Sequence, residues 1–194
     1  MWKRYTVAVS AALFFATLGS AATERPATAT LMNNAAAARD GRHDFDFYYG
    51  SWKISHRRLR HPLRGSNEWY AFEGTLVMRG MLGFANMDEN VLNMPSGRLL
   101  GVGVRLYNQK TREWSIYFGT DKQGEFPWPP TVGSFDEQGV GRFYDRETFE
   151  GKPIVVRYMW SHSAPNKCHW EQAFSPDDGT TWETNWVQEL TRTH

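Results

Sequence analysis

The stretch Gly50-Ser51-Trp52 opens the first convincing run of alternating side chains, and Arg192 closes the last such run about 140 residues later. Between them lie short runs that alternate with a period of two, which is typical of β-strands. A β-barrel requires that its first and last strands meet, because closure removes the exposed edges of the sheet. The pair therefore indicates a small barrel, which would form a cup for an apolar ligand.

The expected strands follow one another with turn-forming residues between them. Alternation is clearest at 52–56, 70–78, 86–93, 100–106, 114–118, 154–160, 170–174 and 182–190. Turns are indicated at 108–111, 136–139, 150–153 and 175–179, where Pro, Asp, Asn or Gly recur. Short connections make successive strands antiparallel neighbours. The chain is thus predicted to be all-β, an antiparallel up-and-down barrel of about ten strands.

The first 42 residues do not share this pattern. Two positive charges at Lys3 and Arg4 precede an apolar stretch at 7–18 and small residues at 19–22, which is the order of a signal peptide. A membrane anchor is the alternative interpretation. We expect a signal peptide at 1–22, a linker at 23–42 and the barrel at 43–194. The protein would then be periplasmic or secreted, with no stable membrane span after cleavage.

Composition narrows the function. Residues 43–194 have the length of one domain, and the single cysteine, Cys168, cannot form an internal disulfide. The 22 basic and 21 acidic residues nearly balance, which argues against a nucleic-acid partner. Nine Trp, eight Tyr and twelve Phe supply large, rigid apolar surfaces for a core or a ligand pocket. The oligomeric state stays open.

The Gly50-Ser51-Trp52 stretch with a late Arg192 resembles the signature of calycins, the superfamily of lipocalins and fatty-acid-binding proteins. The resemblance implies that Trp52 packs under Arg192 at the closed end, so both are structural. A wider similarity links the chain to an uncharacterised bacterial family of calycin-like proteins, and it implies the fold and adds little chemistry. The motifs that carry it are His43-Asp44-Phe45-Asp46-Phe47, Gly50-Ser51-Trp52, Trp170-Glu171-Gln172-Ala173-Phe174-Ser175 and Thr181-Trp182-Glu183-Thr184-Asn185-Trp186.

Polar residues within the strands are the candidates for chemistry. Asn86, Asp88 and Asn90 share one face of a strand, since alternate residues point the same way. Turned inward, they would form a polar stripe in an aromatic cup, and a desolvated Asp88 could act as a general acid or base. An outward, solvated face is equally compatible with the pattern. If the parity is reversed, Glu89 becomes the inward carboxylate.

Three further charged residues, Arg105, Arg157 and Glu171, lie mid-strand among apolar neighbours. Arg157 and Glu171 flank a short connection and would pair across strands. Outside the barrel this is a surface pair of little energetic consequence. Inside, the guanidinium groups would bind a ligand carboxylate and Glu171 would be a second acid or base, with His56 or Arg157 stabilising charge.

The expected ligand-binding residues also include cup walls and rim loops. Tyr117, Trp160 and Gln172 are predicted to line the walls, although core filling is the ordinary role of barrel aromatics. Two apolar connections, 81–85 with Phe84 and 125–130 with Trp128, are predicted to form the mouth.

Metal and cofactor sites have little support. A cluster of His43, Asp44 and Asp46 would offer metal ligands, but the alternating Phe45 and Phe47 favour a segment that plugs one barrel end. Haem ligation is the alternative for His56, His162 and His169, which show no close spacing. No metal and no cofactor is therefore predicted.

Three functions remain. The first is an exported binder of a small apolar or aromatic molecule. The second is a cofactor-independent isomerase, cyclase or lyase on the same barrel. The third is a structural cell-envelope protein whose barrel is filled by its own side chains. The sequence favours the binder, because it carries no nucleophile elbow, phosphate loop or dinucleotide fingerprint.

Overall fold

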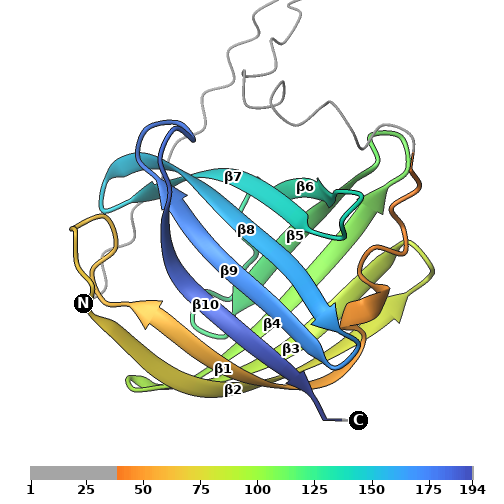
Figure 1. Ribbon diagram of the computed structural model, residues 1–194, viewed down its shortest axis with the longest axis horizontal. Helices are drawn as coiled ribbons and strands as arrows, with labels where there is room; N and C mark the ends of the chain where they lie inside the picture. The colour runs from red at the N-terminus through yellow and green to blue at the C-terminus, as the bar shows by residue number, and fades with distance from the viewer. Residues whose placement is uncertain (1–38, 194) are drawn as a thin grey trace, which may run out of the picture. The chain divides into compact units, whose positions relative to one another are not determined.

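The computed structural model describes residues 39–193. The predicted signal peptide at 1–22 and linker residues 23–38 lie outside the described residues. What is described is a short 3-10 helix, η3 (Asp46–Tyr48), followed by ten β-strands that form a closed barrel (Figure 1). No helix in this described part of the chain is both long enough and apolar enough to cross a membrane.

The strands run in chain order around the barrel. They are β1 (Gly50–Leu59), β2 (Trp69–Met81), β3 (Ala85–Met94), β4 (Gly97–Asn108), β5 (Glu113–Thr120), β6 (Thr131–Phe135), β7 (Gly141–Phe149), β8 (Lys152–Ala164), β9 (Lys167–Ser175) and β10 (Glu183–Arg192). Each pairs antiparallel with its neighbour, and β10 pairs with β1 in a register that sets Trp52 opposite Arg192. The predicted all-β, ten-stranded, closed antiparallel barrel is confirmed.

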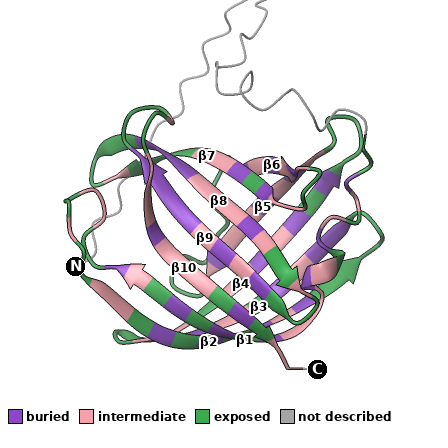
Figure 2. Cartoon of the chain, viewed as in Figure 1, coloured by how far each residue is buried: buried purple, intermediate pink, exposed green. Residues whose placement is uncertain are grey.

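Alternation along the strands separates a packed interior from an exposed outside (Figure 2). Strand β1 follows the expected pattern, with Trp52, Ile54 and His56 buried between exposed residues. Strand β4 reverses the usual arrangement over its middle part, because Leu100, Val102, Val104 and Leu106 point outward while Gly101 and Gly103 point inward. The reason is space: a Cβ added at Gly101 would lie 2.5 Å from the ring of Phe118, so a larger inward residue would clash.

One end of the barrel is closed by residues 41–49, here called the plug. Its Phe45 is fully buried in the core, with ring centroids 4.9 Å from Phe135 and 5.1 Å from Trp114. The backbone amide of Gly41 donates to the Tyr107 hydroxyl, and its carbonyl accepts from Trp114 Nε1. The chain is therefore joined to the barrel from Gly41 onward.

Arg192 ties the plug to the last strand. Its guanidinium carbon lies 4.2 Å from the centroid of the Trp52 ring, as a cation over an aromatic face. The same group donates to the carbonyls of Phe47 at 2.6 Å and Pro165 at 3.0 Å, and also to that of Tyr49. Arg192 thus satisfies three carbonyls where strands and plug meet, which is a structural role.

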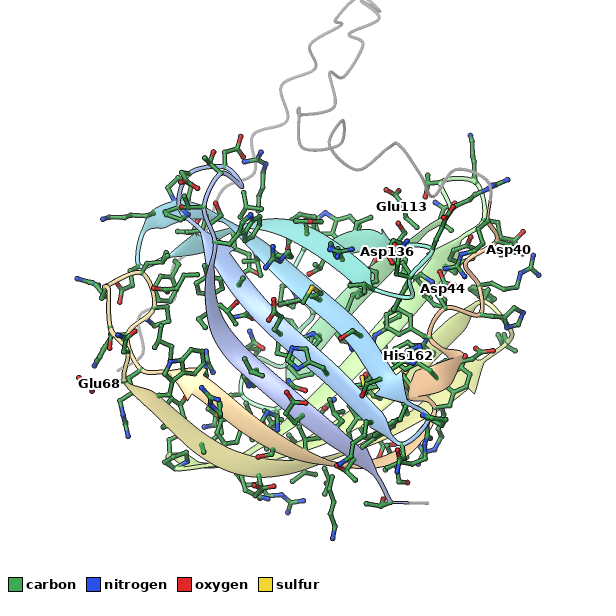
Figure 3. All side chains as sticks on the ribbon, in the orientation of Figure 1. Asp40, Asp44, Glu68, Glu113, Asp136 and His162 are labelled. Carbon is green, nitrogen blue, oxygen red and sulfur yellow. The ribbon has the colours of Figure 1, made fainter. Side chains whose placement is uncertain are left out.

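The other end of the barrel carries the longest connections, at 60–68, 121–130 and 176–182. Figure 3 shows the two ends by their labelled residues, with Asp44 of the plug and His162 at one side and Glu68 at the opposite side. Because antiparallel strands alternate in direction, the hairpin between β2 and β3 returns to the plugged end. The open end is consequently where a ligand would enter.

Candidate functional site

The barrel holds an interior cavity of about 80 Å³, here called the inner cavity. It adjoins the plug at Tyr48, and strands β2 to β5 and β8 to β10 contribute to its wall. The lining residues are Tyr48, Leu76, Asp88, Asn90, Leu92, Gly103, Arg105, Ile116, Phe118, Tyr158, Trp160, Trp170, Gln172, Trp186 and Gln188. Most of this wall is apolar or aromatic, so the few polar groups would fix a ligand's orientation.

The polar groups gather at the floor of the inner cavity. Asp88, which is 1% exposed, forms an ion pair with Arg105 Nη1, and it also accepts from the Asn90 amide. Arg105 Nη1 lies 3.4 Å from Asn86 Oδ1. The inward interpretation of Asn86, Asp88 and Asn90 is therefore correct, and Arg105 is inward as well. Glu89 points outward, where it pairs with Arg79 at 2.8 Å.

Local sequence explains how the floor accommodates a charged pair. Asp88 stands opposite Gly103 on β4, and a Cβ at Gly103 would lie 2.7 Å from the Asp88 carboxylate. The missing side chain gives the carboxylate room to turn toward Arg105. The guanidinium in turn lies over aromatic faces, with its carbon 5.1 Å from Phe45 and 5.5 Å from Trp160. Both partners are thus held within one closed network.

The wall opposite this floor is built by β8, β9 and β10. Trp160, Trp170 and Trp186 meet edge to face, with centroids 5.9 Å and 5.5 Å apart along the series. Gln172 stands among them and donates to Asn185 Oδ1 at 2.8 Å. Trp160 and Gln172 therefore lie where the sequence placed them, on the cavity wall.

A larger hollow of about 1090 Å³, here called the mouth, occupies the open end. Phe118, Tyr158 and Trp186 line both the mouth and the inner cavity, so these three residues form a neck between them. Trp128 stands on the rim of the mouth and is 80% exposed. The mouth prediction was thus right for Trp128.

The mouth carries charges of both signs. Asp145 is half-buried, and burial raises the pKa of its carboxyl to about 6. Burial and the neighbouring Asp145 charge also raise the pKa of Glu147. Arg58 lies across the mouth, with its guanidinium carbon 4.6 Å from the centroid of the Trp186 ring. A ligand entering the barrel would pass these groups before the neck.

His56 does not line the inner cavity, which corrects its assignment as a catalytic residue. Its ring stacks on Phe72 at 4.4 Å, and its Nδ1 accepts from Trp186 Nε1 at 3.2 Å. Of these two partners only Trp186 lines the inner cavity, so His56 contacts the cavity wall from behind. Burial lowers the pKa of His56 from 6.5 to about 4, so the imidazole is neutral at physiological pH.

This neutral histidine makes stability depend on pH. The folded pKa lies below the unfolded one, so the unfolded chain takes up the proton first as pH falls. Above about pH 6.5 His56 is neutral in both the folded and the unfolded state, and its contribution to the free energy of unfolding is fully present. As the pH falls from 6.5 to 4, the free energy of unfolding decreases by about 3 kcal/mol through His56. We expect urea unfolding to show this loss when wild type is compared with His56→Gln at pH 7 and pH 4. If the free energies of unfolding of the two proteins differ by the same amount at both pH values, the expectation is contradicted. Asp44 and Asp145 contribute with the opposite sign, but they are present in both proteins, so their contributions cancel in the comparison.

Arg157 and Glu171 lie on the outer face of the barrel, which corrects their assignments as ligand-binding and catalytic residues. Their side chains alternate with the inward Tyr158, Trp160 and Trp170. Arg157 Nη2 approaches Glu171 at 3.4 Å, and its guanidinium lies 4.6 Å from the Trp182 ring. The pair holds the connection before β10 against the outside of the sheet.

Two further predicted ligand residues are also misplaced. Tyr117 is on the outer face of β5, where its ring packs near Phe126 and Trp128 of the 121–130 connection. It supports the rim and does not line the inner cavity. Phe84 is in the hairpin at the plugged end, where its carbonyl accepts from the Tyr107 amide. The plugged end is opposite the mouth, so Phe84 cannot gate the mouth.

The acidic residues of the plug are engaged with neighbours. His43 Nδ1 lies 2.9 Å from Asp46, and Asp44 pairs with Arg39 at 2.6 Å. Within residues 39–193, no group of three or more His, Cys, Asp or Glu side chains is arranged to hold a metal ion. The exposed His162 stacks near Phe47 at 4.4 Å.

Sequence reasoning missed the neck and the charged part of the mouth. The strand at 141–149 was not delineated, although Phe143, Asp145 and Glu147 alternate there with a period of two. That alternation is the signal that would have placed both carboxylates on the inward face. Tyr158 and Trp186 were recognised as strand residues, but nothing in the pattern shows that they contact the same opening.

Comparisons with known proteins support the architecture. Neither the family models nor the curated protein sequences gave a match. Among solved structures, the S-type phycobiliprotein lyase CPES from Guillardia theta aligns with a TM-score of 0.55 and 11% identity, covering 81% of this chain and 94% of that one. At this identity the likeness shows the fold alone.

Two other barrels align less closely. EF1p2_mFAP2b bound to DFHBI has a TM-score of 0.43 and 9% identity, covering 79% of this chain and 99% of that one. A redesigned β-barrel has a TM-score of 0.43 and 8% identity, covering 81% and 98%.

Proposed function

We propose that this protein binds a small aromatic or apolar molecule, which enters at the mouth and reaches the inner cavity through the neck. The observation that carries the proposal is the buried polar floor of Asp88 and Arg105 beneath an aromatic wall. Binding sites of this type are mostly apolar with a few convergent polar groups. For stability alone, well-packed apolar residues would serve a barrel interior as well as a charged pair, because such a pair is costly to desolvate.

The volumes indicate how much of the ligand lies in each compartment. Ligand pockets for drug-sized molecules measure roughly 300–1,000 Å³. The inner cavity of about 80 Å³ would take only the end of such a molecule, whereas the mouth of about 1090 Å³ would take its body. We therefore expect an elongated ligand that inserts a head group past Phe118, Tyr158 and Trp186.

The floor favours binding over acid-base catalysis by Asp88. One Asp88 oxygen is paired with Arg105 and the other accepts from Asn90. A general base needs an oxygen within hydrogen-bond reach of the substrate proton. Because both oxygens are already engaged, Asp88 serves better as a fixed charge that orients Arg105 than as a proton acceptor.

The wider setting belongs to the same proposal. We assign the chain to the calycin-like proteins on the basis of the Trp52–Arg192 pair and the ten-stranded barrel. The predicted signal peptide would deliver it to the periplasm or the medium. There, a barrel open at one end could capture a small molecule without a cofactor.

The proposal is tested by purifying the protein from its own source, extracting any bound small molecules from it, and identifying them by mass spectrometry. We expect one aromatic or apolar compound per barrel. Protein without any bound compound, together with no saturable binding of the uncharged fluorescent aromatic probe N-phenyl-1-naphthylamine, would favour the structural alternative and reject the binder.

Trp128→Ala is expected to weaken binding of N-phenyl-1-naphthylamine by about ten-fold, since an aromatic contact contributes about 1–1.5 kcal/mol. The side chain is so exposed that the free energy of unfolding should change by less than about 0.5 kcal/mol. Phe126→Ala is the matched control, because Phe126 is in the same connection but lines the outside of β4 and β5. Equal losses in the two variants would show that the mouth does not hold the probe.

A further inference from the structure

The large apolar side chains that are exposed on the barrel lie in one sector of it. Within residues 39–193 they belong to β2, to β4, to the hairpin that joins β2 to β3, and to the 121–130 connection that packs on β5. They are Met81, Leu82, Phe84, Leu100, Leu106, Phe126 and Trp128. Strands β2 to β5 are successive neighbours in the sheet (Figure 1). The apolar exposure is therefore concentrated on one side of the molecule.

Strand β4 forms the centre of this sector. Its outward residues from Leu100 to Leu106 are all aliphatic, because Val102 and Val104 lie between the two leucines. The crowded interior explains the inward glycines of β4, but it places no demand on the outward side chains. Threonine would suit an exposed strand equally well. A continuous aliphatic row on the outside is typical of a surface that another molecule covers.

The strand register continues this row onto both neighbouring strands. Met87 of β3 and Tyr117 of β5 stand on the two sides of Val104, and Val91 of β3 stands opposite Leu100. We call the surface formed by these residues, the outward side chains of β4 and the exposed residues of the 81–84 hairpin the outer apolar face. Trp128 lies at its border with the mouth.

Charge on the outer apolar face is sparse and balanced. Among the outward residues of β2 and β3 that stand level with 100–106 of β4, the charged ones are Arg79 and Glu89, which pair with each other at 2.8 Å. Elsewhere the outside of the barrel carries charges on each strand from β7 to β10 and on β1, such as Lys53, Arg142, Arg157, Glu171 and Glu189. A neutral face suits a second copy of itself, whereas an anionic membrane would favour a basic one.

The face is large enough for a specific dimer. Strands rise about 3.4 Å per residue and lie about 4.8 Å apart, so β2 to β5 cover roughly 20 Å by 19 Å between the levels of Leu100 and Leu106. The hairpin tip, where Leu82 is 90% exposed, extends this footprint to about 500 Å². A specific interface needs about this area from each partner. Because the face meets the requirement at its lower limit, we expect a dimer that dissociates on dilution.

From these observations we infer that the outer apolar face is the interface of a symmetric homodimer, in which the β4 strands of two copies pack face to face. Two-fold symmetry lets each copy contribute the same patch, and homodimer interfaces are the more apolar class of interface. The dimer goes beyond the proposed function, because neither Leu100 nor Leu106 lines the inner cavity.

Sedimentation velocity of the protein purified from its own source tests this inference. Between about 1 µM and about 100 µM, the mass should rise from that of one chain to that of two. Leu106→Glu brings two like charges into the interface and should raise the dissociation constant of the dimer at least about 100-fold. Met159→Glu is the matched control, because Met159 is on the outer side of β8, between the inward Tyr158 and Trp160. It should leave the dissociation constant unchanged.

Wild-type protein that stays monomeric at about 100 µM would overturn the inference, and so would a dimer that Leu106→Glu leaves intact. If Leu106→Glu does not fold, methyl NMR of the wild type on dilution decides. The methyl groups of Leu100 and Leu106 should shift as the dimer dissociates, and shifts at Met159 alone would contradict the proposed interface. Monomeric wild type that binds phosphatidylcholine vesicles, with binding lost in Leu106→Glu, would assign the face to a membrane and reject the dimer.

Discussion

Asp88→Asn is expected to destabilise the folded protein by about 3–5 kcal/mol, because it leaves the Arg105 charge buried without its partner. The substitution preserves size and shape, so lost packing does not contribute. Urea unfolding monitored by tryptophan fluorescence at pH 7 measures the change. The adjacent Glu89→Gln is the matched control, since Glu89 forms an exposed pair with Arg79. Its cost should be less than about 1 kcal/mol.

A double variant separates the charge effect from any other role of Asp88. Replacing both partners, as Asp88→Leu with Arg105→Met, removes the unpaired charge and keeps the interior apolar. Its free energy of unfolding should exceed that of Asp88→Asn. If Asp88→Asn costs no more than Glu89→Gln, the ion pair is not desolvated, and the floor is open to water.

Phe45→Ala is expected to lower the free energy of unfolding by about 3–5 kcal/mol, through the loss of a fully buried ring and the cavity that it leaves. The ring contacts Trp114, Phe135, Phe143 and Trp160, so it joins the plug to β5, β6, β7 and β8. Thermal and urea unfolding report the change.

The neighbouring Phe47→Ala provides the comparison for the plug. Phe47 is only half-buried and packs at the outer side of the plug against Phe135 and His162. Its removal should cost less than half as much. An equal or larger cost for Phe47 would mean that the plug is held from its outer side, and that the inner cavity is not sealed by Phe45.

Much of the fold could be read from the sequence because it depends on local patterns. The period of two identifies strands, and turn residues separate them. Trp52 and Arg192 show that the first and last strands meet, and these two residues are indeed directly opposite each other. The inward direction of Asn86, Asp88 and Asn90 followed from the same alternation once an inward face was chosen.

The errors arose where a pattern leaves two solutions. Arg157 and Tyr117 alternate correctly with their neighbours, but alternation does not say which set is inside. On β4 the inward set is the small one, Gly101 and Gly103, because Phe118 and Asp88 from adjacent strands occupy the space. Such a preference depends on cross-strand partners, which the sequence of one strand does not contain.

The position of Phe84 was wrong for a different reason. Alternating strand directions place every second connection at the same end, and the connection that follows β2 returns to the end where β1 begins. Counting strands from Gly50 would have put Phe84 beside the plug and Trp128 at the open end.

The register shift between Thr184 and Trp186 could not be predicted, since a β-bulge there leaves no clear signal in the sequence.

The central claim is that ligand binds inside the barrel and not on its surface. Methyl NMR during titration with N-phenyl-1-naphthylamine tests this directly, because Leu76, Leu92 and Ile116 line the inner cavity while Leu100 lines a groove of about 390 Å³ on the outer face. We predict saturable shifts of the three interior methyl groups, with Leu100 unchanged. Shifts at Leu100 alone, or none at the interior methyl groups, would contradict the account.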